Sequence, residues 1–184
     1  MDATKKYSIP YKGLKNGTHL FDFAVDGALF KAFDNTDIKG CCCDAKVTLT
    51  RSETWLELAT TITGDVVVEC DRCLEDCRVP VNYEGVLTVK FSNEICDYDG
   101  QIMWLSPAES QVDLAQYIYE SIVLSLPYQR VHPEGECNAE MLEHFKVVSD
   151  EEFAAIEAAA HQEEEQQGAL RKLAELKVKM ETEK

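Results

Sequence analysis

Apolar and polar residues alternate with a period of two through the first half of the chain. This period places successive side chains on opposite faces, so each run predicts a half-buried β-strand. Turn-forming residues such as Asp26-Gly27, Asn35 and Gly40 separate the early runs. The runs are Leu20 to Val25, Val47 to Leu49, Trp55 to Leu58, Ile62 to Glu69 and Val79 to Phe91, with a shorter candidate at Ile102 to Leu105. Together they predict a mainly antiparallel sheet.

The pattern changes to helical spacing after Ser106-Pro107. Apolar residues recur three or four positions apart from Leu114 to Ser125, which places them on one face of a helix. Asp113 is expected to cap the N-terminus of this helix, and Pro127 to end it. We expect an α+β fold in which this one helix packs on a face of the sheet.

The last part of the chain has a different character. Ser149 and Glu152 form a capping-box pattern that opens an Ala- and Glu-rich helix. Further on, a narrow apolar stripe at helical spacing comprises Leu170, Leu173, Leu176 and Met180. A helix with so little apolar surface is marginal alone, because packing supplies most helical stability. We therefore expect an α+β domain at residues 1–148 and an acidic helical tail at 149–184, either disordered or docked on a partner.

The charge of the chain is strongly negative, with a formal net value of −16 among 184 residues. Residues 17–150 carry 24 acidic and 9 basic side chains, so the acidity lies in the expected folded body. Phosphate contacts need clustered Lys and Arg, so direct nucleic-acid binding is not expected, and a basic partner fits better. Two alternatives stay open: the charge serves only solubility, or the lysines of residues 1–16 contact RNA locally.

Eight cysteines in a chain of this size raise the possibility of a secreted disulfide scaffold. The N-terminus has no apolar signal region, and no apolar run is long enough to span a membrane. We therefore expect a cytoplasmic protein with reduced thiols.

Cys70 and Cys73 form a C-x-x-C motif between two predicted strands, a spacing that lets two thiolates reach one metal ion. Thioredoxin-type chemistry needs this motif at a helix N-terminus within a βαβ unit, which the pattern does not predict. A thiol–disulfide redox function for Cys70 and Cys73 is kept as the alternative. A pair of plain reduced thiols is the structural alternative.

His132 and Cys137 follow in an irregular segment just after the predicted helix. With Cys70 and Cys73 they make a Cys₃His set, sufficient for a closed tetrahedral structural zinc site. Cys77 is a possible substitute ligand. The consecutive Cys41 to Cys43 are interpreted as mainly buried apolar residues, because neighbouring strand residues face opposite ways.

No enzyme motif stands out in the sequence. It has no Gly-rich phosphate loop, no G-x-S-x-G and no H-E-x-x-H, and its carboxylates are spread as on a solvated face. A zinc ion with four protein ligands also has no open position to activate water. We expect a protein that is not an enzyme.

Several segments, taken in order, resemble the YceD family of large ribosomal RNA subunit accumulation proteins. They are Val66 to Leu74, Val112 to Leu114, Leu124 to Pro127, Val131-His132 and Cys137, with likeness at Tyr11 to Gly17 and Leu170 to Leu176. The Cys41 to Cys43 triplet, Cys77 and an acidic insert around Glu151 to Gln167 depart from the family pattern.

The resemblance implies a role in large ribosomal subunit biogenesis and ribosomal RNA accumulation. Combined with the acidic body, it suggests that the partner is a basic large-subunit ribosomal protein or a pre-ribosomal particle, and not naked ribosomal RNA.

Overall fold

The fold is described from a computed structural model, which describes residues 4–93, 98–143, 153–155 and 157. The chain divides into two compact units, Met1–Asn138 and Ala139–Lys184. Only α3 (Ala139–Glu143) and residues 153–155 and 157 of the second unit are described. The expected boundary at residue 148, the capping box at Ser149 and the Leu170 to Met180 stripe lie outside the described residues and stay predictions.

The first unit is built on a five-stranded sheet in the order β2-β3-β4-β5-β6. Its strands are β2 (Gly17–Asp26), β3 (Ile38–Arg51), β4 (Trp55–Glu69), β5 (Asp76–Phe91) and β6 (Ile102–Leu105). A second, two-stranded pairing joins β1 (Ser8–Ile9) to β7 (Val112–Asp113), and the 3₁₀ turn η1 (Lys5–Tyr7) precedes it. The α+β class predicted from the sequence is confirmed.

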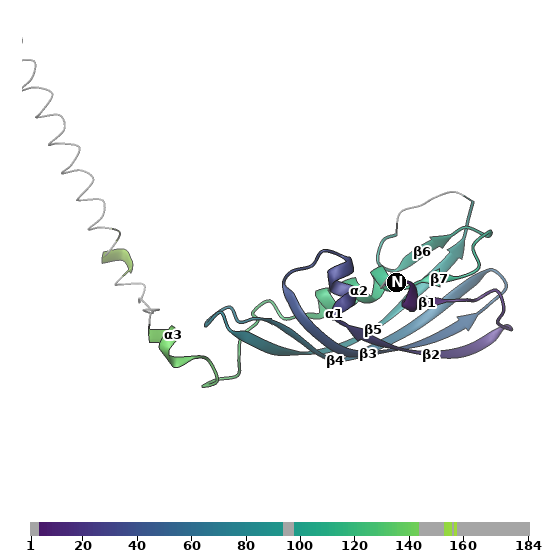
Figure 1. The fold of residues 1–184 in the computed structure, drawn as a ribbon. Helices are drawn as coiled ribbons and strands as arrows, with labels where there is room; N and C mark the ends of the chain where they lie inside the picture. Colours follow the sequence, from purple (N-terminus) through teal and green to yellow (C-terminus); the bar gives the residue numbers. More distant parts are fainter. Residues whose placement is uncertain (1–3, 94–97, 144–152, 156, 158–184) are drawn as a thin grey trace, which may run out of the picture. The chain divides into compact units, whose positions relative to one another are not determined.

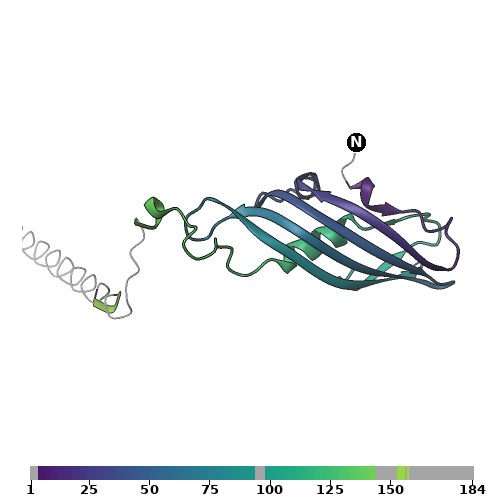
Figure 2. The ribbon, with the colours of Figure 1, turned by 90° about the horizontal axis from the view of Figure 1, so that it is seen from below.

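Two helices lie on the same side of the sheet, which curves beneath them (Figures 1 and 2). They are α1 (Gly27–Ala32) and α2 (Ala115–Ser125). Tyr117, Ile118 and Ile122 of α2 are buried, as the helical spacing predicted. The other face of the sheet carries the exposed residues of the strand alternation, so the core forms a single layer between sheet and helices.

The sequence predicted a turn at Asp26-Gly27, but a short second helix begins there. The Asp26 carboxylate accepts a hydrogen bond from the Ala28 amide at 2.9 Å, which caps α1. Leu29 and Phe30 are then buried against the core. A local Asp-Gly signal fits both a turn and a helix cap, and the apolar contacts decide between them.

The runs at Trp55 to Leu58 and Ile62 to Glu69 were expected to be separate strands, and they are one continuous strand, β4. The alternation is not interrupted at Thr60, whose side chain is buried on the inner face between Leu58 and Ile62. Threonine is a good strand former, so the polar stretch does not break the strand.

Gly40 was expected in a turn and lies within β3 instead, where the pairing with β4 shifts register between Ile38 and Gly40. The sheet is also not wholly antiparallel. β6 pairs with β5 in parallel, with Thr88 opposite Ile102 and Phe91 opposite Leu105.

Gly64 in β4 allows the close approach of β3. Its φ is +150°, and an added Cβ would lie 2.6 Å from the Cys43 Cα. Only glycine fits such a conformation next to a neighbouring backbone. The absence of a side chain at Gly64 therefore lets β4 pair closely with β3 at Cys42 and Cys43.

The cysteine triplet lies within β3, and only part of its expected burial is seen. Cys43 is buried, Cys41 is half-buried and Cys42 is exposed on the outer face. The expectation of three mainly buried residues was therefore wrong for Cys42, because strand alternation forces the middle residue outward. A hydrogen bond to Cys43 and burial raise the pKa of Cys41, which keeps that thiol protonated.

Candidate metal centre

The C-x-x-C motif forms the tight connection between β4 and β5. The Cys70 amide donates to the Glu75 carbonyl at 2.8 Å, and the Leu74 amide donates to the Cys70 carbonyl at 2.9 Å. Leu74 has a φ of 62°, the left-handed conformation that reverses the chain after the second cysteine. This connection brings Cys70 and Cys73 together, and both are buried.

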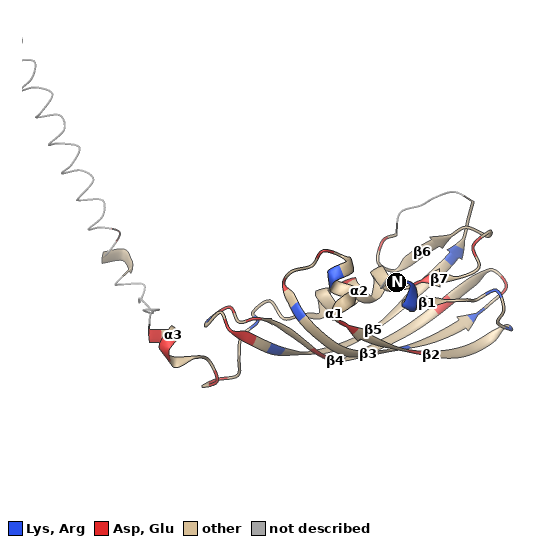
Figure 3. Ribbon diagram, in the orientation of Figure 1, with Lys and Arg blue, Asp and Glu red and all other residues tan. Residues whose placement is uncertain are grey.

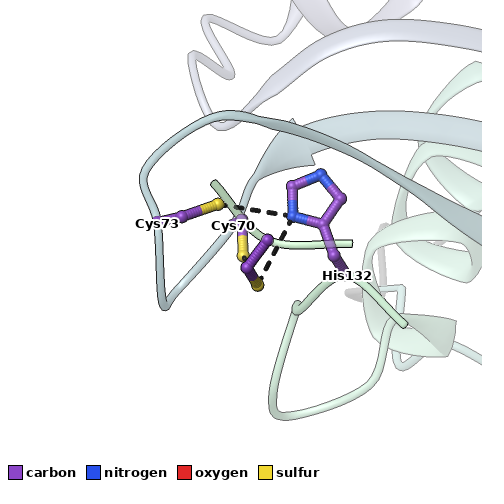
Figure 4. Close-up of side chains that lie close together, drawn as sticks. Cys70, Cys73 and His132 are labelled. Atoms are coloured by element: carbon purple, nitrogen blue, oxygen red, sulfur yellow. Dashed lines mark hydrogen bonds between the residues drawn. The ribbon is translucent and has the colours of Figure 1, made fainter. Parts of the chain in front are cut away.

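The second pair comes from the segment that follows α2. It returns along the β4–β5 connection and brings His132 and Cys137 next to the first pair. The four candidate ligand atoms, one each from Cys70, Cys73, His132 and Cys137, lie within 4.8 Å of one another. Figure 4 shows Cys70, Cys73 and His132 converging from the two segments.

The individual distances suit one tetrahedral ion. The Cys70 and Cys137 sulfurs are 4.0 Å apart, and the His132 Nδ1 lies 3.4 Å from the Cys73 sulfur and 3.9 Å from that of Cys137. Ligand atoms around a tetrahedral zinc, with Zn–S about 2.3 Å and Zn–N about 2.0 Å, are about 3.5–3.8 Å apart. A small contraction of the cluster would give zinc its usual bond lengths.

A contact of Nε2 with the backbone orients the imidazole of His132. Nε2 lies 3.2 Å from the Asp76 carbonyl oxygen, to which an Nε2–H donates. In the neutral tautomer with the proton on Nε2, Nδ1 is directed at the sulfurs, as a metal ligand needs. The neighbouring thiols, Cys70 first among them, raise the pKa of His132.

The Cys70 thiol ionises more readily than an ordinary cysteine. Burial opposes its ionisation, but backbone N–H groups, those of Cys73 and Arg72 first, donate to its sulfur and lower its pKa to about 6. A thiolate at neutral pH is the form that binds a metal ion. The same property would also serve a nucleophilic thiol.

Hydrogen bonds around the Cys/His cluster hold the two segments together. The Asp71 amide donates to the Arg130 carbonyl at 2.8 Å, and the Arg130 amide donates to Asp71 Oδ2 at 2.7 Å. Asn138 donates to the Glu75 carboxylate at 2.6 Å. Sequence patterns gave no signal for these pairs, because their members are about sixty residues apart in the chain.

Cys77, the possible substitute ligand, is not part of this group of four. It lies in β5 with its side chain on the inner face, and burial raises the pKa of its thiol. Cys96, His144 and His161 lie outside the described residues. Among the described residues, Cys70, Cys73, His132 and Cys137 are the one group of three or more metal-ligating side chains that gathers around a common point.

The comparisons with known proteins give one family. No curated protein matches the chain, and no solved structure matches it. Within the part of the chain that the structure describes, no helix has the length and apolar character needed to cross a membrane.

A family model described as "Large ribosomal RNA subunit accumulation protein YceD" matches residues 58–177. The match covers nearly two thirds of the 184 residues. It includes most of β4, the C-x-x-C connection, α2 and the His132–Cys137 segment. The chain therefore belongs to the YceD family.

Proposed function

We propose that this chain is a non-enzymatic accessory factor in the biogenesis of the large ribosomal subunit. The observation that carries the proposal is the family match over residues 58–177, whose description names accumulation of the large ribosomal RNA subunit. The matched region contains the Cys/His cluster, so the cluster belongs to the part that the family shares. Growth and ribosome profiles of a bacterium lacking the gene test it. We expect a deficit of large subunits, and unchanged subunit ratios would contradict the proposal.

We further propose that Cys70, Cys73, His132 and Cys137 bind one structural zinc ion. The short distances between the four side chains, the Asp76 contact at the His132 Nε2 that turns Nδ1 toward the sulfurs, and the lowered pKa of Cys70 support it. The ion would join the β4–β5 connection to the segment after α2, and four protein ligands would leave no position for substrate.

Metal analysis of the reduced protein tests the zinc proposal. We expect about one zinc per chain, reduced strongly by Cys137→Ser and retained by Cys42→Ser, because Cys42 is exposed on β3 away from the cluster. Folded, reduced wild-type protein without zinc would contradict it.

We propose that the partner is a basic large-subunit ribosomal protein or a pre-ribosomal particle that presents one. Residues 17–150 carry 24 acidic against 9 basic side chains, and Asp and Glu are spread along the strands (Figure 3). Such a surface attracts Lys- and Arg-rich proteins and repels phosphates.

Binding at two salt concentrations tests the choice of partner. Tagged full-length protein is mixed with basic large-subunit proteins or with ribosomal RNA fragments in equal molar amounts. We expect the proteins to be retained at low salt and lost at high salt, because salt screens surface charge. Retention of RNA without the proteins would contradict the charge argument.

A thiol–disulfide function of Cys70 and Cys73 is the second candidate, and the lowered pKa of Cys70 favours it. The backbone donors that lower this pKa equally stabilise a metal thiolate, and the motif lies between strands and not at a helix N-terminus. Alkylation rates with and without zinc separate the two. A metal site predicts strong protection of both cysteines by one zinc per chain, and a redox site predicts none.

We infer a cytoplasmic location. The seven described cysteines are free, and a zinc site needs reduced thiolates. Fractionation of cells with an antibody to the native protein tests the location.

A further inference from the structure

Among the described residues of the first unit, the two most exposed large apolar side chains are four positions apart, Leu124 in the last turn of α2 and Tyr128 just after the helix. Leu124 is 82% exposed and Tyr128 is 99% exposed. The same helix buries Tyr117, Ile118 and Ile122. Isolated exposed apolar residues are ordinary, but an exposed leucine followed closely by a fully exposed tyrosine that lines a hollow is typical of a contact surface.

Tyr128 lines a hollow of about 200 Å³, and Val123, the residue before Leu124, lines it too. Its apolar lining comes from Ile38 and from the end of α2 and the turn that follows it: Val123, Leu126, Pro127 and Tyr128. Asn35, Asp37 and Arg130 supply the polar lining. A contact between proteins commonly combines apolar and polar groups in this way. We call Leu124, Tyr128 and this hollow the α2-end surface.

The free charge around the α2-end surface is negative. Arg130 forms an ion pair with Asp71 at 3.6 Å, and nearby Lys39 pairs with Asp76 at 2.7 Å and with Glu69 at 3.3 Å. Asp34 and Asp37, both exposed, form no ion pair with any cation that the structure describes. Arg130 and Lys39 are thus matched by carboxylates. Lys31, exposed at the end of α1, forms no ion pair with a described carboxylate either, so Asp34 and Asp37 outnumber it and the unmatched charge is net acidic.

The surface continues to the candidate metal centre. Asp37 and Arg130 also line a second hollow of about 170 Å³, together with Cys70, Asp71 and Leu74. The chain after Tyr128 leads through Arg130 to His132. The segment that carries Tyr128 is therefore held in place by the Asp71–Arg130 contacts and by the ligands of the cluster.

We infer that the α2-end surface docks a basic segment of a protein, with an apolar side chain of that segment beside Leu124 and Tyr128 and its Lys or Arg facing Asp34 and Asp37. The inference rests on the proposed function and names the surface through which it acts. Charge complementarity selects this occupant, because the phosphates of RNA would meet unmatched carboxylates. Exposed aromatic anchors commonly carry a large share of binding affinity at such contacts.

The test uses the full-length protein, zinc-loaded, and the proteins extracted from purified bacterial large ribosomal subunits after removal of RNA. Retained proteins are identified by mass spectrometry, and the dissociation constant of the best-retained basic one is measured. For the double variant Leu124→Ala with Tyr128→Ala we expect binding to weaken roughly tenfold or more. Asp37→Lys should weaken it as well and reduce its salt dependence.

Matched controls come from the outer face of the sheet. Leu20→Ala is the control for the double variant, because Leu20 is 77% exposed on β2. Asp44→Lys is the control for Asp37→Lys, because Asp44 is exposed on β3. Both controls should bind as the wild type does. Thermal unfolding of every variant shows whether it is folded.

The outcomes separate the inference from the proposed function. If the wild type retains basic proteins and the double variant retains them equally, the inference is overturned and the proposed function stands. If the wild type retains none, the inference and the proposed basic partner both fall, and the accessory role is judged by the subunit ratios. If the α2-end variants lose binding and the controls keep it, the surface is assigned. Binding of an RNA fragment that depends on Tyr128 would also overturn the inference.

Discussion

Asp71 shows how one side chain orders a site without being a ligand. It lies between Cys70 and Cys73, and its carboxylate and backbone amide both bind Arg130, two residues before His132. The contacts join the two segments that carry the four proposed ligand atoms. Neighbours that orient ligands in this way commonly affect metal affinity as much as tenfold or more.

For Asp71→Ala we expect zinc to dissociate about tenfold more readily, because the segment with His132 and Cys137 loses its alignment. Competition with a chromophoric chelator measures the affinity. Asp44→Ala, a change of the same kind on the exposed face of β3, is the control. Equal zinc affinity in the two variants would show that Asp71 has no positioning role.

At Gly64 the neighbouring β3 backbone leaves no room for a side chain. For Gly64→Ala we expect the free energy of unfolding to fall by about 2–4 kcal/mol, since the new Cβ meets the β3 backbone and φ is positive. Urea unfolding measures it. Gly13→Ala is the matched control, because a Cβ at Gly13 has no atom within 4 Å. A similar stability of both variants would contradict the close approach.

At the scale of elements, the buried face of α2 contributes to stability, and its exposed last turn is the part proposed to bind a partner. Its inner residues pack on the sheet, where Tyr117 meets Tyr83 through a hydroxyl contact of 3.2 Å. Its last turn leaves Leu124 exposed. The Asp113 carboxylate accepts from the Ala115 amide at 2.9 Å, although the N-cap position falls on Leu114, one residue later than expected.

For Ile118→Ala we expect a loss of about 2–5 kcal/mol in the free energy of unfolding, because the fully buried side chain leaves a cavity. For Leu124→Ala on the same helix the expected change is within about 0.5 kcal/mol. Urea unfolding of both zinc-loaded variants compares them. A large loss for Leu124→Ala would mean that this side chain is needed for folding and is not free for a partner.

At the scale of the whole molecule, the chain consists of a folded first unit and a second unit that begins at Ala139. The proposed metal ligands, the α2-end surface and the sheet all belong to the first. The acidic body and the family match both involve this unit, so it should carry the fold without residues 149–184.

For a shortened chain of residues 1–148 we expect the thermal midpoint to stay within a few degrees of the full-length value, since a change of about 1 kcal/mol or less shifts it by that much. Calorimetry with equal zinc loading measures it. A drop of ten degrees or more would show that the Leu170 to Met180 stripe contributes to the core.

The sequence by itself determined the parts of this protein that depend on local periodicity. Alternation at period two predicted the strands, spacing of three to four predicted α2 with its buried face, and the C-x-x-C between strands marked the β4–β5 connection. These follow from backbone geometry, which fixes where successive side chains point. The ordered motifs also indicated the family, and the match over residues 58–177 confirms it.

Only the tertiary structure decided features that join distant residues. The gathering of His132 and Cys137 with Cys70 and Cys73, the Asp71–Arg130 contacts and the parallel β5–β6 pairing depend on how segments fold back on one another. Asp26-Gly27 and Gly40 were misread because burial of neighbouring residues outweighs a local turn preference. The periodicity of apolar residues depends only on neighbours along the chain. Packing against distant residues decides which of several locally allowed conformations buries the most apolar surface.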